Sequence, residues 1–225
     1  MLNFHFLLSL SGKGQCWDGA VRMPTIASWP GHIPAGISID QLTSSMDLLP
    51  TVAKLTGGDL PQDRVIDGKG LFSLLTNQTQ KSSHDFVFHY CGKQVHAVRY
   101  HPRDSDSVWK AHFVTPKWTE GTESCIGKRI VCGCFGDHVK VQDPPLLFDV
   151  SNDPSESSPV ASDRPDHKWV MREIHPALQA HKRSISDVPS QLGAKNSFHP
   201  SLQMCCSFPF CSCEETGRRL QHYPK

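Results

Sequence analysis

The sequence lacks the compositional signs of several classes of protein. Its 23 basic and 22 acidic side chains leave a formal charge of +1 over 225 residues, with no block of like charge. Composition therefore does not indicate a surface for nucleic acid or for lipid headgroups. No stretch approaches the roughly 18 consecutive apolar residues that span a membrane. We expect no nucleic-acid partner and no membrane span in this chain.

The N-terminus lacks the parts of a convincing signal peptide. Residues 2–10 are apolar except for Asn3, His5 and Ser9, but neither a basic n-region nor a small-residue cleavage site accompanies them. We treat residues 1–11 as an atypical N-terminal segment. The apolar content of 38% still predicts a folded chain that is long enough to bury a core.

Spacings typical of metal sites are also absent. The chain has 13 histidines, but no His-x-x-x-His or His-Glu-x-x-His pattern that a helix would bring to one face. His175 and His181 are expected on different faces of a helix. Four other histidines lie on or beside predicted strands, where we favour packing roles over ligation: His89, His96, His101 and His112. We expect no metal site in this chain.

Cysteine, in contrast, is abundant, with nine in the chain. Most fall in two clusters, which are Cys125, Cys132 and Cys134, and then Cys205, Cys206, Cys211 and Cys213. Neither cluster has the C-x2-C spacing of zinc sites, so we favour disulfides in an oxidising compartment over a metal. Cys205 and Cys206 are adjacent, and a bridge between neighbours would be strained. Each is therefore expected to pair with Cys211 or Cys213.

The first third of the chain alternates between strand-like and helix-like patterns. An apolar run at residues 20–29 predicts a short buried strand. Asp47 is expected to cap a helix that runs to Leu55 and is closed by Gly57. Residues 71–75 predict one further helical turn. The sequon that follows makes Asn77 a candidate glycosylation site and agrees with a lumenal or secreted protein.

From about residue 85 the pattern changes to short β-like runs. Alternation and enrichment in β-branched and aromatic residues predict an antiparallel sheet. Its four strands are expected at residues 86–90, 95–100, 108–114 and 146–150. A helix is predicted from Trp169 to His181, and Pro176 inside it predicts a kink or a break. The shift near residue 80 is the candidate domain boundary.

Four segments, taken in order, resemble the arylsulfatases, most closely the steroid-sulfatase-like branch. They are Gly12-Lys13 through Trp17-Asp18-Gly19 to Pro24, then residues 43–53, then residues 144–150 with Asp153-Pro154, and finally Cys205-Cys206 with Cys211-x-Cys213. The resemblance implies an alkaline-phosphatase-like α/β fold with a smaller C-terminal domain, in which a four-stranded antiparallel sheet carries one helix. Residues 12–78 would end the catalytic α/β domain, residues 79–190 would form the small domain, and residues 191–225 a cysteine-rich tail.

The same resemblance implies hydrolysis of a sulfate ester by a formylglycine hydrate beside calcium. Lys13 matches the family lysine that contacts the sulfate, where an ammonium would stabilise the negative charge that builds on the sulfate oxygens. Without the surrounding motif, Lys13 would be interpreted as a solvated loop lysine. Arg22 matches a family position that we interpret as structural, pairing with a buried carboxylate. The alternative for Arg22 is a surface salt bridge.

The family pattern also implies how the cysteines pair. The implied disulfides are Cys91–Cys134, Cys125–Cys132, Cys205–Cys211 and Cys206–Cys213. In this pattern Cys16 has no disulfide partner.

The sequence departs from the family in its catalytic groups. No cysteine lies in the Cys-x-Pro-x-Arg context from which the family makes formylglycine, and we expect the calcium ligands of the family before residue 12. We therefore expect a truncated C-terminal chain of an arylsulfatase-type hydrolase, which binds neither cofactor and is inactive alone. One alternative is a non-enzymatic fragment or isoform that binds a partner or a full-length sulfatase in the secretory pathway lumen. Another is a sequence whose true N-terminus lies further upstream.

Overall fold

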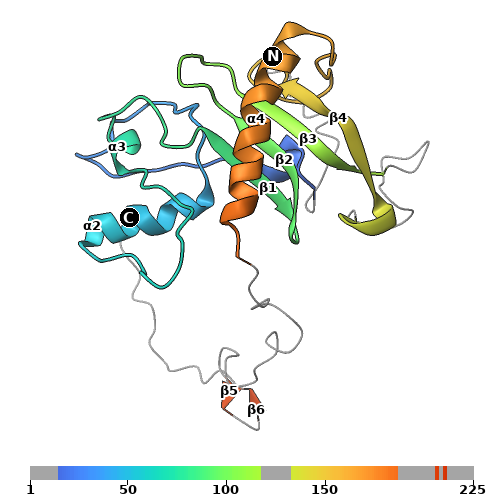
Figure 1. Cartoon of the computed structure of the whole chain (residues 1–225). Helices are drawn as coiled ribbons and strands as arrows, with labels where there is room; N and C mark the ends of the chain where they lie inside the picture. The colour runs from blue at the N-terminus through green and yellow to red at the C-terminus, as the bar shows by residue number, and fades with distance from the viewer. Residues whose placement is uncertain (1–14, 118–132, 187–205, 208–209, 212–225) are drawn as a thin grey trace, which may run out of the picture. The chain divides into compact units, whose positions relative to one another are not determined.

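The computed structural model describes residues 15–117, 133–186, 206–207 and 210–211 (Figure 1). The chain divides into two compact units, Met1–Lys182 and Arg183–Lys225, and each is described by itself. Among the described residues, no helix combines the length and the apolar character needed to cross a membrane.

A four-stranded antiparallel sheet organises the first unit. Its strands pair in chain order, as β1 (Phe86–Cys91), β2 (Gln94–Tyr100), β3 (Trp109–Pro116) and β4 (Val139–Asp149), and η2 (Gly136–His138) precedes β4. The predicted sheet is therefore confirmed. β4 begins well before the predicted residue 146, although it contains Pro144 and Pro145. Because β4 lies at the edge of the sheet, a proline there can direct its missing N–H away from the ladder.

The helix α4 (Pro165–Ser184) lies across one face of this sheet, in front of β1 to β3 in Figure 1. The core beneath it contains Val98, Ala111 and Leu147 from the strands and Val170, Ile174 and Leu178 from the helix. The four-residue spacing places the helical members on one face. α4 continues through Pro176, so of the predicted kink or break the break is wrong. Pro176 is exposed, and the buried residues on both sides of it hold the helix to the sheet.

The opposite face of the sheet, called the polar face below, carries charged side chains beside an apolar cluster that includes Phe148. Successive side chains of a strand point to opposite faces, so the neighbours of Val98 and Ala111 point away from α4. These neighbours are Arg99 on β2 and, on β3, Lys110 and His112. Arg99 and Lys110 are cross-strand partners. The short helix α1 (Asp18–Val21) brings Asp18 to this face, where it contacts both cations.

The predicted strand at residues 20–29 is wrong. Its first residues belong to α1, and residues 22–30 are exposed, with Ile26 96% accessible. A strand is stabilised by pairing with a neighbour, and no strand in the described part of the chain pairs with this run. The apolar character of these residues was therefore a poor guide to their backbone conformation.

The predicted helix after Asp47 is confirmed as α2 (Leu48–Thr56), which ends at Gly57 in the left-handed conformation with a φ of 68°. It is preceded by η1 (Ser45–Asp47) and followed by α3 (Phe72–Leu75), the predicted turn at residues 71–75. The role expected for Asp47 is wrong, because its side chain does not cap α2. Ser44 caps η1 in a capping box with Asp47.

Asp47 instead connects three segments through its buried carboxylate. It accepts hydrogen bonds from the backbone N–H of Ser44 at 2.8 Å and of Lys69 at 2.7 Å, and pairs with His84 Nε2 at 2.7 Å. The side chain is 0% exposed, and the bond to His84 is fully buried. They tie α2 to the segment that enters β1.

Beyond residues 183–186, the described part of the second unit is one short ladder. β5 (Cys206–Ser207) and β6 (Phe210–Cys211) pair antiparallel, with Cys206 opposite Cys211.

Candidate functional site

The residues that follow Lys13 are buried against the polar face of the sheet. Lys13 itself lies outside the described residues, but the next described positions, Gln15 to Asp18, are each no more than 9% exposed. Trp17 stacks on the imidazole of His112, with 4.2 Å between the ring centroids, and meets Phe148 edge-on at 5.7 Å. The Trp17-Asp18 part of the motif therefore packs directly against the sheet.

Asp18 lies at the centre of a buried ion network. Its Oδ1 contacts the guanidinium of Arg99 and lies 2.8 Å from Lys110 Nζ. Its backbone N–H donates to Glu156 Oε2 at 2.6 Å. Lys110 Nζ lies 3.0 Å from Glu156 Oε1, so one ammonium joins both carboxylates. Lys110 is 0% exposed, and a buried charge of this kind is tolerated only when it is paired.

Glu156 completes the network from the loop after β4. Its backbone is left-handed, with a φ of 53°, and its Oε1 accepts a hydrogen bond from His112 Nε2 at 2.7 Å. The carboxylate of Asp153 shapes this loop by accepting the backbone N–H groups of Ser157 at 3.1 Å and Ser158 at 2.9 Å. The Asp153-Pro154 part of the sequence motif thus has a structural role close to the network.

The network keeps both carboxylates ionised. Burial raises the pKa of Asp18, but the charges of Lys110 and Arg99 outweigh it, so this pKa is lowered. Burial also opposes ionisation of Glu156, and the hydrogen bond from His112 and the charge of Lys110 reverse the effect and lower its pKa. The pKa of His112 is lowered, first by burial. A neutral His112 therefore donates to an ionised Glu156, and two cations balance two carboxylates.

Two further titratable groups lie beside the network and are held neutral. Burial raises the pKa of the free Cys16 thiol from 9.0 to about 11, which makes it a poor nucleophile. Burial and the charges of Lys110 and Arg99 lower the pKa of His89 from 6.5 to about 3. Neither group is poised to act as a nucleophile or a general base at neutral pH.

The buried carboxylate that we expect to pair with Arg22 does not lie among the described residues. Arg22 is exposed, and no carboxylate in the described part of the chain forms an ion pair with it. The arginine that pairs with a buried carboxylate is Arg99, because only the sheet face brings a guanidinium to Asp18. Asn77 is exposed in the turn after α3, an accessible position for a modifying enzyme.

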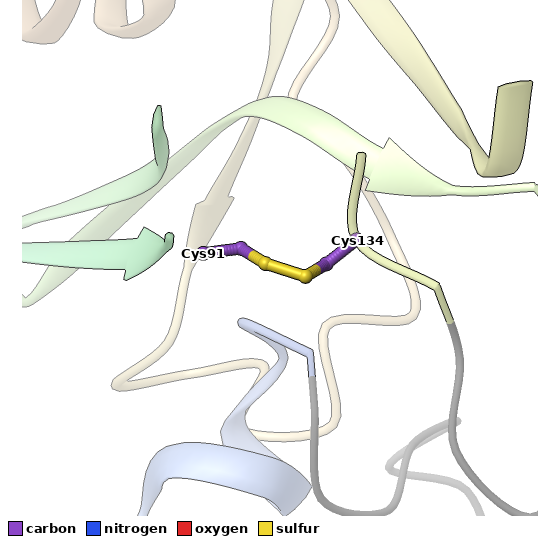
Figure 2. The surroundings of a disulfide bond; sticks show 2 residues. All are labelled: Cys91 and Cys134. Atoms are coloured by element: carbon purple, nitrogen blue, oxygen red, sulfur yellow. A yellow bond between two sulfur atoms is a disulfide. The ribbon is translucent and has the colours of Figure 1, made fainter. Parts of the chain in front are cut away.

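A disulfide joins Cys91 to Cys134, the pair implied by the resemblance, and the two Cα atoms are 6.0 Å apart. Figure 2 shows the bridge between the end of β1 and the segment that leads to η2. The other implied pairs involve positions outside the described residues: Cys125, Cys132, Cys205 and Cys213.

The described residues do not fit the calcium that the resemblance implies. Among them, no group of three or more histidine, cysteine, aspartate or glutamate side chains could hold a metal ion. The acidic groups of the network are engaged by Lys110, Arg99 and His112. We therefore assign no calcium ligand to these residues.

Sequence reasoning missed Arg99, Lys110 and Glu156. A signal was present, because Arg99 and Lys110 each interrupt an apolar stretch of a predicted strand. Charged residues on a buried strand need a partner, but nothing in the local pattern pointed to Asp18, 81 and 92 residues away.

Comparison with known proteins identifies the family. Residues 82–213 match the family model for the C-terminal region of aryl-sulfatase. The chain belongs to the arylsulfatase family. Residues 10–117 also match the C-terminal model of N-sulphoglucosamine sulphohydrolase. Human arylsulfatase D is 48% identical over 211 residues, which are 92% of this chain and 35% of that protein. Human steryl-sulfatase is 44% identical over 206 residues, 90% of this chain and 35% of that protein.

A solved sulfatase structure has the same fold as this arylsulfatase-family chain. PsFucS1 sulfatase from Pseudoalteromonas sp. matches with a TM-score of 0.62 and 25% identity, over 79% of this chain and 34% of that one. The chain thus has the fold of a C-terminal sulfatase region and spans about a third of the length of the relatives it matches.

Proposed function

We propose that this chain is the C-terminal portion of an arylsulfatase-type sulfuric ester hydrolase and that Lys13 is its contact to the sulfate. The observation that carries the proposal is the burial of Gln15, Cys16, Trp17 and Asp18 on the polar face of the sheet. In the sequence Lys13 precedes this anchored run by two residues. Such anchoring suits a group that must meet a substrate in one orientation.

Lys13 would act through its charge. Attack at sulfur increases the negative charge on the sulfate oxygens, and a fixed ammonium stabilises that charge in the transition state. It would not transfer a proton. The resemblance implies formylglycine and calcium for the full-length family, but the sequence has no Cys-x-Pro-x-Arg precursor and the described residues offer no calcium site. No step is therefore assigned to either group, and the purified chain is expected to be inactive alone.

Assay of the purified 225-residue chain tests its inactivity. We expect no release of a chromogenic aryl sulfate at any calcium concentration, and measurable turnover would contradict this part of the proposal.

A chimera tests the role of Lys13. The C-terminal third of human steryl-sulfatase, the part that this chain matches, would be replaced by the chain. Lys13→Ala should lower kcat/KM of an active chimera by about 10²- to 10³-fold, the usual cost of removing one transition-state donor. Lys140→Ala is the matched control, because Lys140 is an exposed lysine on β4. Equal activity of the Lys13→Ala chimera and its parent would refute the sulfate contact.

A second candidate function is binding to a full-length sulfatase without catalysis. It is favoured by large apolar side chains of the first unit that are 43–96% exposed: Met23, Ile26, Ile37, Leu48, Leu49, Val52 and Leu55. Exposed apolar surface is typical of interaction sites. Size-exclusion chromatography with a full-length sulfatase tests the idea. A well-behaved monomer that does not co-elute with the sulfatase would count against it.

We further propose that the chain resides in the lumen of the secretory pathway, in the endoplasmic reticulum, the Golgi or the lysosome. The Cys91–Cys134 disulfide and the exposed sequon at Asn77 support this location, because both modifications belong to that pathway. Fluorescence microscopy of the tagged chain beside lumenal markers tests it, and a purely cytosolic signal would refute it.

A further inference from the structure

A loop with an accessible backbone joins α2 to α3 along residues 57–71 (Figure 1). Over residues 59–67, no backbone group is hydrogen-bonded to another segment of the described chain. Residues 61–65 are all exposed. The side chain of Arg64 is 61% exposed, and Val65 is 84% exposed. The peptide bond between these two residues can therefore be reached by an enzyme.

An endoprotease binds a stretch of chain, which must open locally before a bond within it is cleaved. Residues 59–67 have no hydrogen bonds to other described segments, so their opening breaks few interactions. The Arg64 guanidinium lies 2.6 Å from the carboxylate of Asp63, but this exposed pair contributes little to stability. Lys54 is exposed too, but its backbone belongs to α2, so cleavage beside it requires a helix to open.

The parts of the chain before and after the loop are held together by buried hydrogen bonds. The carboxylate of Asp47 accepts the backbone N–H of Lys69 and pairs with His84 Nε2, each at 2.7 Å. Thr51 Oγ1 accepts the backbone N–H of Leu71 at 2.7 Å, and Thr51 is itself buried. Asp47 and Thr51 precede the loop tip, whereas all three of their partners follow it. These contacts remain possible in a chain that is cut at the tip.

The ion network on the sheet holds the same two parts together at a second place. Asp18 lies before the loop, and its contacts to Arg99, Lys110 and Glu156 all lie after it. Cys16 is the only cysteine before the loop, and its thiol is free. The two parts are therefore held by non-covalent contacts, with the loop as their covalent link.

We propose that residues 59–67 are a processing site for a trypsin-like endoprotease, and that cleavage after Arg64 yields two pieces that stay assembled. The step consumes one water. The C–N bond between Arg64 and Val65 breaks, the hydroxyl joins the Arg64 carbonyl carbon, and the hydrogen joins the Val65 nitrogen. The carboxylate and ammonium that result lie at exposed positions, so neither needs a buried partner.

Limited digestion of the folded 225-residue chain with trypsin tests the site. Peptide mass analysis follows cleavage after Arg64 and after Lys54 separately, so cuts elsewhere do not enter the comparison. Each rate is divided by the rate for a synthetic peptide of the same local sequence. The normalised rate after Arg64 should exceed that after Lys54 by about tenfold or more, because only the second cut requires a helix to open. Equal normalised rates would overturn the assignment of the site.

Size-exclusion chromatography of the cut chain tests assembly. The piece that ends at Arg64 and the piece that begins at Val65 should elute together under native conditions. They should separate in urea without a reducing agent, because Cys16 is free. Elution of the two pieces at different volumes under native conditions would refute their assembly.

Expression of the C-terminally tagged chain in secretory cells tests whether processing occurs there. A tagged piece that begins at Val65 is expected, and Arg64→Gln should abolish it. Lys54→Gln is the matched control and should leave the piece unchanged, since both lysine and arginine are exposed. Absence of the piece from the parent chain, or its persistence in Arg64→Gln, would overturn the proposal. None of these assays uses a sulfate ester, so their outcome is independent of the test of Lys13.

Discussion

His89 should make the stability of the first unit depend on pH below neutrality. Burial, with the charges of Lys110 and Arg99, lowers its pKa from 6.5 to about 3, and Asp18 only partly opposes the effect. Between these two values the unfolded chain binds a proton that the folded chain does not. The free energy of unfolding therefore falls as the pH is lowered from 6.5 toward 3. The slope approaches about 1.36 kcal/mol per pH unit below 6.5, so acidification from pH 7.5 to 4.5 should cost about 2.7 kcal/mol from this residue alone.

Urea unfolding followed by circular dichroism at pH 7.5, 6.5, 5.5 and 4.5 measures this dependence. His112 has a lowered pKa as well, and Asp18 and Glu156 add acid sensitivity below their ordinary pKa range. The contribution of His89 is therefore measured as the difference in pH dependence between the parent chain and the variant. His89→Gln should reduce the slope of the free energy of unfolding against pH below 6.5 by an amount that corresponds to about one bound proton. The exposed His175→Gln should leave that slope unchanged. Identical slopes for His89→Gln and the parent chain would refute the reasoning.

Three further outcomes are expected. Asp47→Ala should lower the free energy of unfolding by about 3–5 kcal/mol in urea, since three hydrogen bonds to a buried carboxylate are lost. The exposed Asp63→Ala should leave it nearly unchanged, and equal effects would contradict the assignment. Cys91→Ser should cost about 4 kcal/mol on the chain-entropy model, because the bridge to Cys134 closes a loop with a sequence separation of 43, and reducing agent should then shift the urea midpoint less than it does in the parent chain. Asn77→Gln should abolish an endoglycosidase-sensitive gel shift in secretory cells, and a persisting shift would contradict the assignment.

The sheet and its helix were predictable because their signals are local. Alternation along residues 86–90 and 95–100 reflects a strand whose successive side chains point to opposite faces of the sheet. The spacing of Val170, Ile174 and Leu178 likewise reflects the face that α4 turns to the core. Such patterns depend on neighbours a few residues apart, so one sequence is enough to read them.

The ion network was not predictable because its members are far apart in the chain. Asp18 meets Glu156 over a separation of 138 residues, and no local pattern encodes that meeting. The Trp17-Asp18 motif was recognised by resemblance, but its physical role emerged only when the sheet supplied Lys110. The error at residues 20–29 has a related cause, since apolar character does not determine whether a strand finds a partner.

The contact of Asp18 with Arg99 and Lys110 has a consequence for how this protein can be divided. A fragment cut near residue 79, at the compositional boundary, would keep both cations and discard their shared anion. The smallest piece expected to fold would instead start at or before Gln15, the first buried residue of the described run. In this protein the Trp17-Asp18 segment is therefore as much a structural component of the small sheet as the strands themselves.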